Sequence, residues 1–453
     1  MTTAPRSSVR DVVWPAIVVG EDSTLLAMEF QLEQSQWWPA KDLQAHQLRQ
    51  LAPLLRHARA TVPWYEERFG GAGITDAQSL TPEGWSRIPL LTRQDLQHHH
   101  AELVSNSVPP EHGKTHRNKT SGSTGEPLEV LCTEVTGFFW QSLVFRDDLW
   151  HNRDMRKRSV AIRSGRYKAN PLAVHDLPSW GLFSPSLYET GPMTVFYHTT
   201  PLARQVELLE ARSPQYLLTY PSNARDLCRY ARKRPVRLPD LEAVHTYGEP
   251  LTPDVRAACR EAWGVPVQDV YSCEELGFLA LQCPRHEHYH VQSESVLLEV
   301  LDEQGNPCAP GQIGRVVLTS LHNFAMPLIR YAIGDYAEVG AACPCGRGLP
   351  VLTRILGRRR NQVALPDGRL AWPNIGEIWA AIPDVEQIQL VQLGEDEVEV
   401  RFVRQRLLRP QEEQAVSGRI HQALGHPFRL TFTGQDAIPR QPNGKYETFF
   451  DPR

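Results

Sequence analysis

The order of apolar and polar positions along the 453-residue chain predicts several successive regions. The first thirty residues read as loop with one short strand, and leucines at helical spacing then predict helices over about 31–69. From 134 to 320, short apolar runs alternate with helical stretches, which is typical of α/β layers around a largely parallel sheet. After 290, the runs ESVLLEVLDEQGNP and GQIGRVVLTSL read as strands of a small β subdomain.

The last part of the chain, from about 359, has a different pattern. It reads as a helix at NIGEIWAAI, two strands at EQIQLVQL and EVEVRFV, a helix at PQEEQAVSGRIHQAL and a strand at FRLTFTG. We therefore expect an α/β protein with a large N-terminal domain over 1–356, built of layered, mostly parallel sheets and the small β subdomain. A small, mobile C-terminal α+β domain is expected over 357–453.

Composition narrows the class of protein. Hydrophobic residues make up 41% and charged residues 22%, which fits a packed core. A net charge of -4 argues against nucleic-acid binding, and no apolar run approaches the roughly 18 residues of a membrane span. The 8 cysteines are too dilute for a disulfide scaffold. The sequence thus predicts a soluble cytoplasmic protein without nucleic-acid or membrane partners, and it leaves a homodimer open.

The strongest local signal is the run KTSGSTGEP at 119–127. Glycines and hydroxylated residues let backbone N–H groups and hydroxyls converge on an anion, although a plain turn has the same composition. The run lacks the GK[ST] ending of a Walker loop. Four further segments follow it in order: YGEPL at 247–251, DVYSCEELG at 269–277, PLIRYAIGDY at 327–336 and PRQPNGKYE at 439–447.

With these five segments, from about Leu43 to the C-terminus, the chain resembles the adenylate-forming (acyl-CoA synthetase) superfamily. Within it, the chain is similar to the phenylacetate-CoA ligase-like and CapK-like branch. The resemblance implies ATP- and Mg²⁺-dependent activation of a carboxylic acid, which we expect to be aromatic, to an acyl-adenylate with release of pyrophosphate. The acyl group would then pass to a thiol, coenzyme A first. An amine or carrier-protein acceptor, and a catalytically silent ATP-binding relative, remain alternatives.

The resemblance also implies residues that contact the nucleotide. The residues matching the loop that holds the β- and γ-phosphates are Thr120, Ser121, Gly122, Ser123, Thr124 and Gly125. Tyr247, Gly248 and Glu249 match the strand end that lines the adenine, and Tyr271 would stack near the base.

Four more residues complete the implied nucleotide site. Glu275 matches the Mg²⁺-binding glutamate, Asp335 the aspartate that grips the ribose hydroxyls, and Arg358 a second nucleotide contact. Lys445 matches the mobile lysine that bridges the carboxylate and the α-phosphate. Physical chemistry favours these roles, because a carboxylate attacking phosphorus needs a cation to offset charge repulsion, and Mg²⁺ beside phosphates takes only one or two carboxylates.

Each of these residues also has a plainer interpretation. Asp335 could cap a turn, Glu275 could be a solvated surface charge, and Lys445 could lie in a frayed tail. The chain also departs from the family pattern at two positions. Arg360 stands where relatives carry an acidic or lysine hinge residue, and Glu126 stands where many carry lysine.

The implied acyl pocket lies between the adenine strand and the helices before it. Its candidate aromatic residues are Phe138, Phe139, Trp140, Tyr220, with Pro221, and Tyr247. An aromatic wall suits a flat apolar acid, although the FFW run could equally be the buried face of a helix. Gly368 matches the glycine that borders the thiol tunnel in relatives.

Cysteines and histidines in two distant segments suggest a structural zinc site. Cys343 and Cys345 form a C-x-C turn, and Cys283 precedes the run HEHYH. Three thiolates and one imidazole would make a closed tetrahedral set, with His290 first and His288 or His286 as alternatives. Ordinary reduced thiols beside surface histidines remain the alternative.

Overall fold

The structure is a computed structural model, and it describes only part of the chain. The described residues are 5–12, 14–72, 82–119, 128–164, 170, 172–181, 187–358, 362–367, 370–372, 385, 387–404, 406–439 and 449–450. The predicted phosphate-loop residues Thr120–Gly125 lie outside this set. So do Glu126, Arg360, Gly368, Lys445 and the predicted helix at NIGEIWAAI.

The N-terminal part is helical. Its helices are α1 (Glu21–Ser35), α2 (Ala40–Thr61), α3 (Pro63–Gly71), α4 (Pro82–Arg87), α5 (Arg93–His98) and α6 (His100–Leu103). The expectation of loop over the first thirty residues is wrong from Glu21 onward. The apolar residues of α1 show little helical period, and the helix instead gains its buried face by packing Leu25 into a cluster with Phe145 of α7 (Glu134–Trp150).

One 13-stranded sheet forms the centre of the described molecule. Its strands, in spatial order, are β12 (Val296–Leu301), β13 (Ile313–Ser320), β14 (Tyr331–Val339), β15 (Val351–Arg358), β11 (Tyr289–Val291), β10 (Gly277–Gln282), β9 (Val267–Cys273), β8 (Ala243–Tyr247), β7 (Tyr216–Thr219), β4 (Ser159–Arg163), β6 (Met193–Tyr197) and β5 (His175–Leu177), with β1 (Leu91–Thr92) beside β14. Pairing is parallel from β9 to β6 and antiparallel from β9 to β12. The α/β class is confirmed, and the strands predicted as a small β subdomain continue the same sheet.

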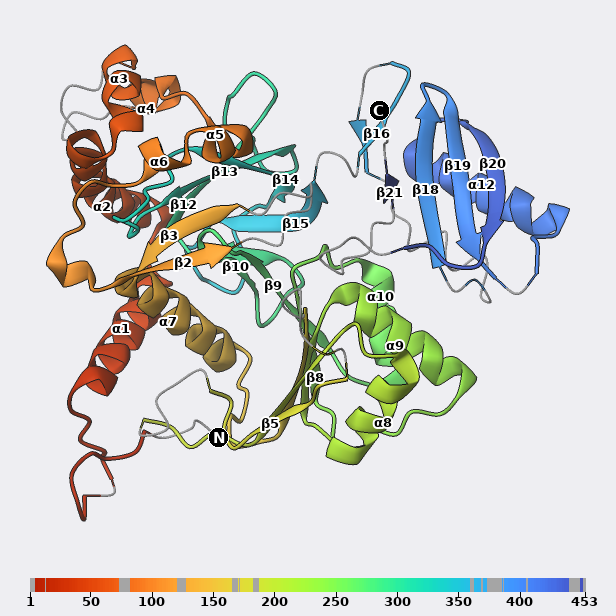
Figure 1. Cartoon of the computed structure of the whole chain (residues 1–453), viewed down its shortest axis with the longest axis horizontal. Helices are drawn as coiled ribbons and strands as arrows, with labels where there is room; N and C mark the ends of the chain where they lie inside the picture. Colours follow the sequence, from red (N-terminus) through yellow and green to blue (C-terminus); the bar gives the residue numbers. More distant parts are fainter. Residues whose placement is uncertain are drawn as a thin grey trace.

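Helices cover both faces of the parallel half. In Figure 1, α8 (Leu202–Arg212), α9 (Pro221–Lys233) and α10 (Pro253–Trp263) lie on one side, and α7 lies on the other with α1. Side chains alternate along a strand, so Val160 and Ile162 of β4 pack into the core beneath α8–α10, whereas Ala161 packs into the core with Phe145. This arrangement leaves the carboxyl ends of the parallel strands at one edge of the sheet.

A separate hairpin frames the predicted phosphate loop. β2 (Thr115–Lys119) pairs antiparallel with β3 (Glu129–Thr133), and Lys119 and Glu129 are Cα partners at its open end. Thr133 caps α7 with a capping box, because its side chain accepts from the backbone of Thr136. The hairpin therefore fixes both flanks of residues 120–127 and the start of α7.

The C-terminal part has a sheet and core of its own. β18 (Gln387–Gly394), β19 (Glu397–Val403), β20 (Arg429–Gln435) and β21 (Phe449–Phe450) form a four-stranded sheet with α12 (Pro410–Leu424), next to the short pair β16 (Val363–Ala364) and β17 (Leu370–Ala371). The two strands, the helix and the last strand read from the sequence are all present. This unit lies apart from the central sheet in Figure 1, and the expected boundary at 356–357 falls at the end of β15.

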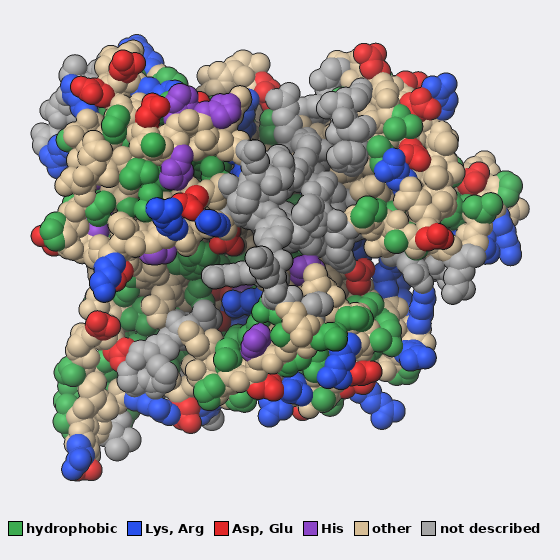
Figure 2. Space-filling view, in the orientation of Figure 1, with side chains coloured by type: hydrophobic (Ala, Val, Ile, Leu, Met, Phe, Trp, Pro, Cys, Tyr) green, Lys and Arg blue, Asp and Glu red, His purple; other side chains and the backbone are tan. Residues whose placement is uncertain are grey.

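Two further features bear on the class of protein. Acidic and basic side chains are interspersed over the described part of the face in Figure 2. Among the described residues, no helix has both the length and the apolar character needed to cross a membrane.

Candidate active site

A half-buried carboxylate at the β14–β15 pair is the first element of the site. Asp335 and Arg358 are Cα partners, and Oδ1 of Asp335 lies 3.0 Å from Nε of Arg358. The Tyr271 hydroxyl donates to Oδ2 of Asp335 at 2.8 Å. Burial raises the pKa of Tyr271, so its phenol remains a protonated donor. The Asp335 carboxylate is thus held at both oxygens, and each oxygen can accept a second bond from a vicinal diol.

The turn before Asp335 requires glycine. Gly334 has φ +88°, and a Cβ there would lie 3.2 Å from Nη1 of Arg358. A larger residue would both strain the backbone and push the guanidinium from its place. The GDY segment of the sequence therefore encodes the position of Arg358 as well as that of Asp335.

Glu275 lies in the turn between β9 and β10, and its side chain is buried with only 5% of the residue exposed. The Tyr331 hydroxyl donates weakly to Oε1 of Glu275 at 3.5 Å. The pKa of Arg358 is raised chiefly by the Asp335 carboxylate and next, among the favourable charges, by Glu275. The interpretation of Glu275 as a solvated surface charge is therefore wrong, and the structure brings it into one electrostatic group with Asp335 and Arg358.

A second group lies at the carboxyl ends of the parallel strands β7 and β8. The rings of Tyr220 and Tyr247 are 4.8 Å apart with planes at 33°. The Glu249 carboxylate accepts from the backbone N–H of Ser222 at 2.9 Å and from its hydroxyl at 3.1 Å, at the N-terminus of α9. Gly248, between Tyr247 and Glu249 in the chain, has φ +76°. Ligands of open α/β sheets bind at such strand ends.

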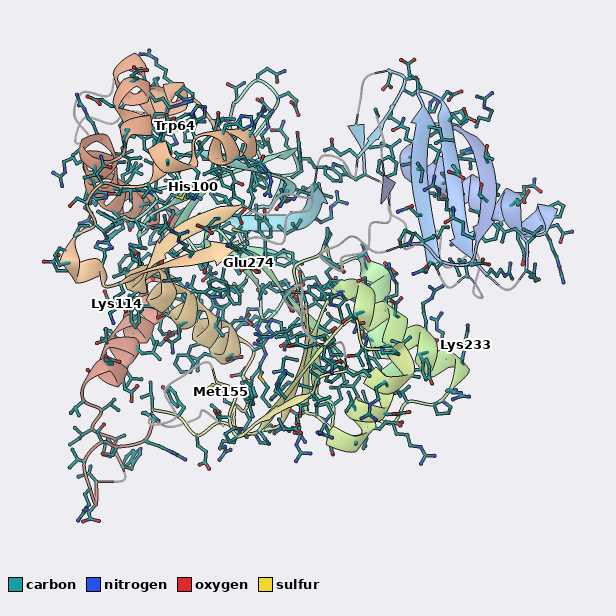
Figure 3. The ribbon with its side chains drawn as sticks, in the orientation of Figure 1. Trp64, His100, Lys114, Met155, Lys233 and Glu274 are labelled. Atoms are coloured by element: carbon teal, nitrogen blue, oxygen red, sulfur yellow. The ribbon has the colours of Figure 1, made fainter. Side chains whose placement is uncertain are left out.

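A recess opens beside Glu275. Its walls come from the β2–β3 hairpin, from α7 and from the segments around Ser295 and Ser320, and they include Phe139 and Trp140. Figure 3 labels Glu274 beside the hairpin, and its carbonyl oxygen accepts from the Asn118 amide at 3.4 Å. The recess thus lies between the buried carboxylate Glu275 and the two strands that flank residues 120–127.

The predicted aromatic pocket residues separate into three places. Trp140 lines the recess and packs on Gly277, which has φ +80° and whose added Cβ would lie 3.2 Å from the Trp140 ring. Phe138 packs against the core cluster that contains Phe145 and so fits the alternative of a buried helix face. Tyr220 lies at the strand ends instead of the recess.

The cysteine and histidine segments meet in space. The ligand atoms of Cys283, His288, His290 and Cys343 all lie within 4.8 Å of one another. His288 Nε2 is 2.9 Å from Cys343 Sγ, and the Cys283 and Cys343 sulfurs are 3.8 Å apart. Cys345 Sγ lies 3.5 Å from His290 Nε2. The structure therefore brings the predicted cysteines and His290 close together. The compact set of four differs from the predicted one, because it contains His288, the alternative ligand, in place of Cys345.

The chemistry of this donor set fits a metal ion. Burial lowers the pKa of His290 to about 4, so its ring is neutral, as a metal ligand must be. The three cysteines are buried, and two thiolates with two imidazoles make a closed tetrahedral set for Zn²⁺.

The turn that carries the cysteines also contacts the α1–α2 junction. Arg347 Nε donates to the Gln36 side chain at 2.7 Å, and the Arg347 guanidinium lies over the rings of Trp37 and Trp150. A Cβ on Gly348 would lie 1.7 Å from the carbonyl oxygen of Trp38. The cluster therefore ties the N-terminal helices to the central sheet.

Comparison with known proteins identifies proteins that are similar to this chain. No protein-family model matches the chain. It is 26% identical over 451 residues to the phenylacetate-coenzyme A ligase of Thermus thermophilus, covering 92% of this chain and 98% of that relative. It is 25% identical over 337 residues to the enzyme of the same name from Pseudomonas putida, covering 71% and 72%. The chain is therefore similar over most of its length to phenylacetate-coenzyme A ligases, which agrees with the resemblance to adenylate-forming enzymes that the five sequence segments carry.

Solved structures agree with this fold. A 2-hydroxyisobutyryl-CoA ligase in the postadenylation state matches with a TM-score of 0.72 at 21% identity, covering 93% of this chain and 92% of that one. The same ligase in the thioesterfication state matches with a TM-score of 0.60, over 92% and 91%. An anthranilate CoA ligase matches with a TM-score of 0.52 at 16% identity, over 73% and 64%.

The sequence predicted the motif residues of the site but missed many of the residues that line the recess. Tyr271, Glu275, Asp335 and Arg358 come together as one group, although Tyr271 holds Asp335 through its hydroxyl. The missed recess residues include His116, Cys132, Ser295, Ser320 and His322. They come from four separate segments and belong to no motif, so no local signal could have identified them.

Proposed function

We propose that the chain is an acid–CoA ligase of the adenylate-forming type, which activates a carboxylic acid with ATP and passes the acyl group to coenzyme A. The observation that carries this proposal is the group of Asp335, Arg358, Tyr271 and Glu275 beside a recess walled by Phe139 and Trp140. The phenylacetate-coenzyme A ligases to which the chain is similar over most of its length support coenzyme A as the acceptor. The aromatic side chains in the recess support an aromatic acid.

In the first step, an oxygen of the substrate carboxylate attacks the α-phosphorus of ATP. A P–O bond forms to give the acyl-adenylate, and the bond to the leaving pyrophosphate breaks. Arg358 and Tyr271 fix the orientation of the Asp335 carboxylate, and its oxygens then accept hydrogen bonds from the ribose hydroxyls. Residues 120–125 hold the leaving phosphates, and Lys445 offsets the charge of the approaching carboxylate. Mg²⁺, when bound near Glu275, supplies neutralising charge on the phosphates.

In the second step, the thiol of coenzyme A attacks the acyl carbonyl, and AMP leaves. In this proposal Lys445 must leave before the thiol can enter, so the unit of residues 357–453 would move between the steps. Its own core, with Val400, Phe402 and Ile420, supports movement as one body. Gly368 borders the path of the thiol in this proposal.

The Cys/His cluster holds a structural zinc ion in this proposal. Cys283, Cys343, His288 and His290 supply the ligands, with Cys345 adjacent as a fifth donor. A closed, buried set is typical of structural sites, because catalytic zinc sites keep a position open for water or substrate. Elemental analysis of the purified protein tests the proposal, with about one equivalent of zinc expected and absence of zinc contradicting it.

ATP–pyrophosphate exchange across a library of aromatic and aliphatic acids tests the main proposal. We expect exchange with a subset of aromatic acids, and loss of at least about a hundredfold in Lys445→Ala. Lys114→Ala is the matched control, since Lys114 is an exposed lysine before β2 and outside the site (Figure 3). An unchanged rate in Lys445→Ala would overturn the lysine assignment.

The acceptor is tested separately. Mass spectrometry of the products should show an acyl-CoA thioester when coenzyme A is added to acid and ATP. Acyl transfer only to an amine or to a carrier-protein thiol would exclude coenzyme A as the acceptor. ATP binding without exchange for any acid would indicate a catalytically silent relative.

A further inference from the structure

One wall of the recess carries polar groups that none of the described residues satisfies. Ser295, Ser320 and His322 all line the recess. Ser320 at the end of β13 is the Cα partner of Val296, the residue after Ser295, and His322 follows two residues later. Within the described part of the chain, the hydroxyls of Ser295 and Ser320 and the Nδ1 atom of His322 have no hydrogen-bond partner.

The hydrogen bonding of His322 determines which of its nitrogens accepts. Nε2 lies 2.8 Å from the carbonyl oxygen of Glu294, and a carbonyl only accepts, so Nε2 carries the proton. Burial lowers the pKa of His322 to about 4, so the ring is neutral and Nδ1 is a bare acceptor. The ring stacks on Phe139 with centroids 3.8 Å apart and planes at 6°, which fixes its orientation.

Two neighbouring polar residues of the recess already have hydrogen-bond partners. The Asn323 amide donates to the Leu131 carbonyl at 2.8 Å and accepts from the backbone of Ala325. The Thr136 hydroxyl donates to the Thr133 carbonyl at 2.7 Å. The Ser295–Ser320–His322 wall differs from these two residues, because its hydroxyls and its Nδ1 atom are unpaired among the described residues.

We propose that the acid activated here carries a hydroxyl group at the end remote from its carboxylate, and that the Ser295–Ser320–His322 wall recognises it. This inference rests on the proposed function, because it assigns the substrate class of the same site. The carboxylate end faces Glu275 and the nucleotide, the ring packs on Phe139 and Trp140, and the hydroxyl donates to Nδ1 of His322. The serine hydroxyls accept or donate to complete its bonds. An acid without the hydroxyl lacks this bond, and sites built to bond a substrate hydroxyl reject analogues that lack it.

Matched pairs of acids test the proposal. Pyrophosphate release is measured for phenylacetate against hydroxyphenylacetates, and for benzoate and cinnamate against their hydroxylated forms. We expect kcat/KM to be at least about tenfold higher for one hydroxylated member of a pair than for its parent.

Two variants of His322 separate its two nitrogens. In His322→Gln, the amide can still donate to the Glu294 carbonyl, but the Nδ1 acceptor is gone, so the preference ratio should fall toward one. In His322→Asn, an amide oxygen can take the place of Nδ1, so a preference of several fold should remain. His57→Gln is the control, because His57 bonds the Phe324 carbonyl at 2.8 Å in a similar manner but does not line the recess. Circular dichroism establishes that each variant is folded.

The outcomes distinguish this inference from the proposed function. Release of pyrophosphate with parent acids as efficiently as with every hydroxylated partner overturns the inference and leaves the proposed function standing. A hydroxyl preference that survives unchanged in His322→Gln also overturns it. If no acid in the series supports pyrophosphate release, the proposed function itself is overturned, and the proposed substrate class with it.

Discussion

The hydroxyl of Tyr271 offers a sharp test of the nucleotide site, because its removal changes one atom. Tyr271→Phe deletes the 2.8 Å hydrogen bond to Oδ2 of Asp335 and leaves the ring in the core. A hydrogen bond to a charged group contributes about 1.5–3 kcal/mol to stability. Arg358 still holds Oδ1, so we expect the lower end, about 1.5 kcal/mol of lost unfolding free energy in urea.

The effect on ATP follows from orientation. Without the hydroxyl, the Asp335 carboxylate can rotate, and restoring its ribose-binding orientation costs about 1 kcal/mol, or roughly fivefold in the KM for ATP. The value of kcat should change little, since the acid and Lys445 are untouched. ATP–pyrophosphate exchange at varied ATP concentration measures both constants.

Tyr65→Phe is the matched control. Tyr65 is also a buried tyrosine of the same core, and its hydroxyl donates to the Pro327 carbonyl at 2.9 Å. It should lose similar stability without any change in the KM for ATP. If Tyr271→Phe and Asp335→Asn both leave the KM for ATP unchanged, the nucleotide does not bind at Asp335 and the assignment is refuted.

Three further changes have outcomes that the structure sets. Burial raises the pKa of Glu29 from 4.5 to about 8, so the folded state keeps a proton that the unfolded state releases. The unfolding free energy should therefore fall as pH rises from about 4.5 to 8. Glu29→Gln should abolish this fall, which reaches up to about 3 kcal/mol at pH 7, whereas Glu67→Gln, at an exposed position, should leave it unchanged. Gly277→Ala should lower the unfolding free energy by about 2 kcal/mol and raise the KM for the acid, since it strains φ and displaces the Trp140 ring; Gly264→Ala, with similar φ but open space, should cost less and leave that KM unchanged. Stripping zinc with a chelator should lower the melting temperature by several degrees and expose the tryptophans around Arg347 to quenching, and a metal-free protein with the same melting temperature would contradict the structural role.

The sequence by itself determined the fold class and most of the order of the elements, and it predicted the residues that we assign to a nucleotide site. Apolar residues at strand or helix spacing were enough to predict β18, β19, α12 and β20, because the side of each element that packs on the core shows in its own sequence. The aspartate, arginine and glutamate of the site could be predicted because they stand in segments that resemble the motifs of adenylate-forming enzymes. α1 escaped detection, since its buried face is chosen by contact with α7 rather than by a helical period.

Only the tertiary structure decided which residues share a space. The sheet brings Asp335 to Tyr271 across 64 positions of the chain, and it brings Ser320 and His322 to the recess beside α7. It also separated Phe138 from Trp140, two residues apart on one helix, because side chains at that spacing point to different faces. Pairing across a sheet depends on the whole set of strands, so the wall that we assign to the substrate hydroxyl has no trace in any single segment.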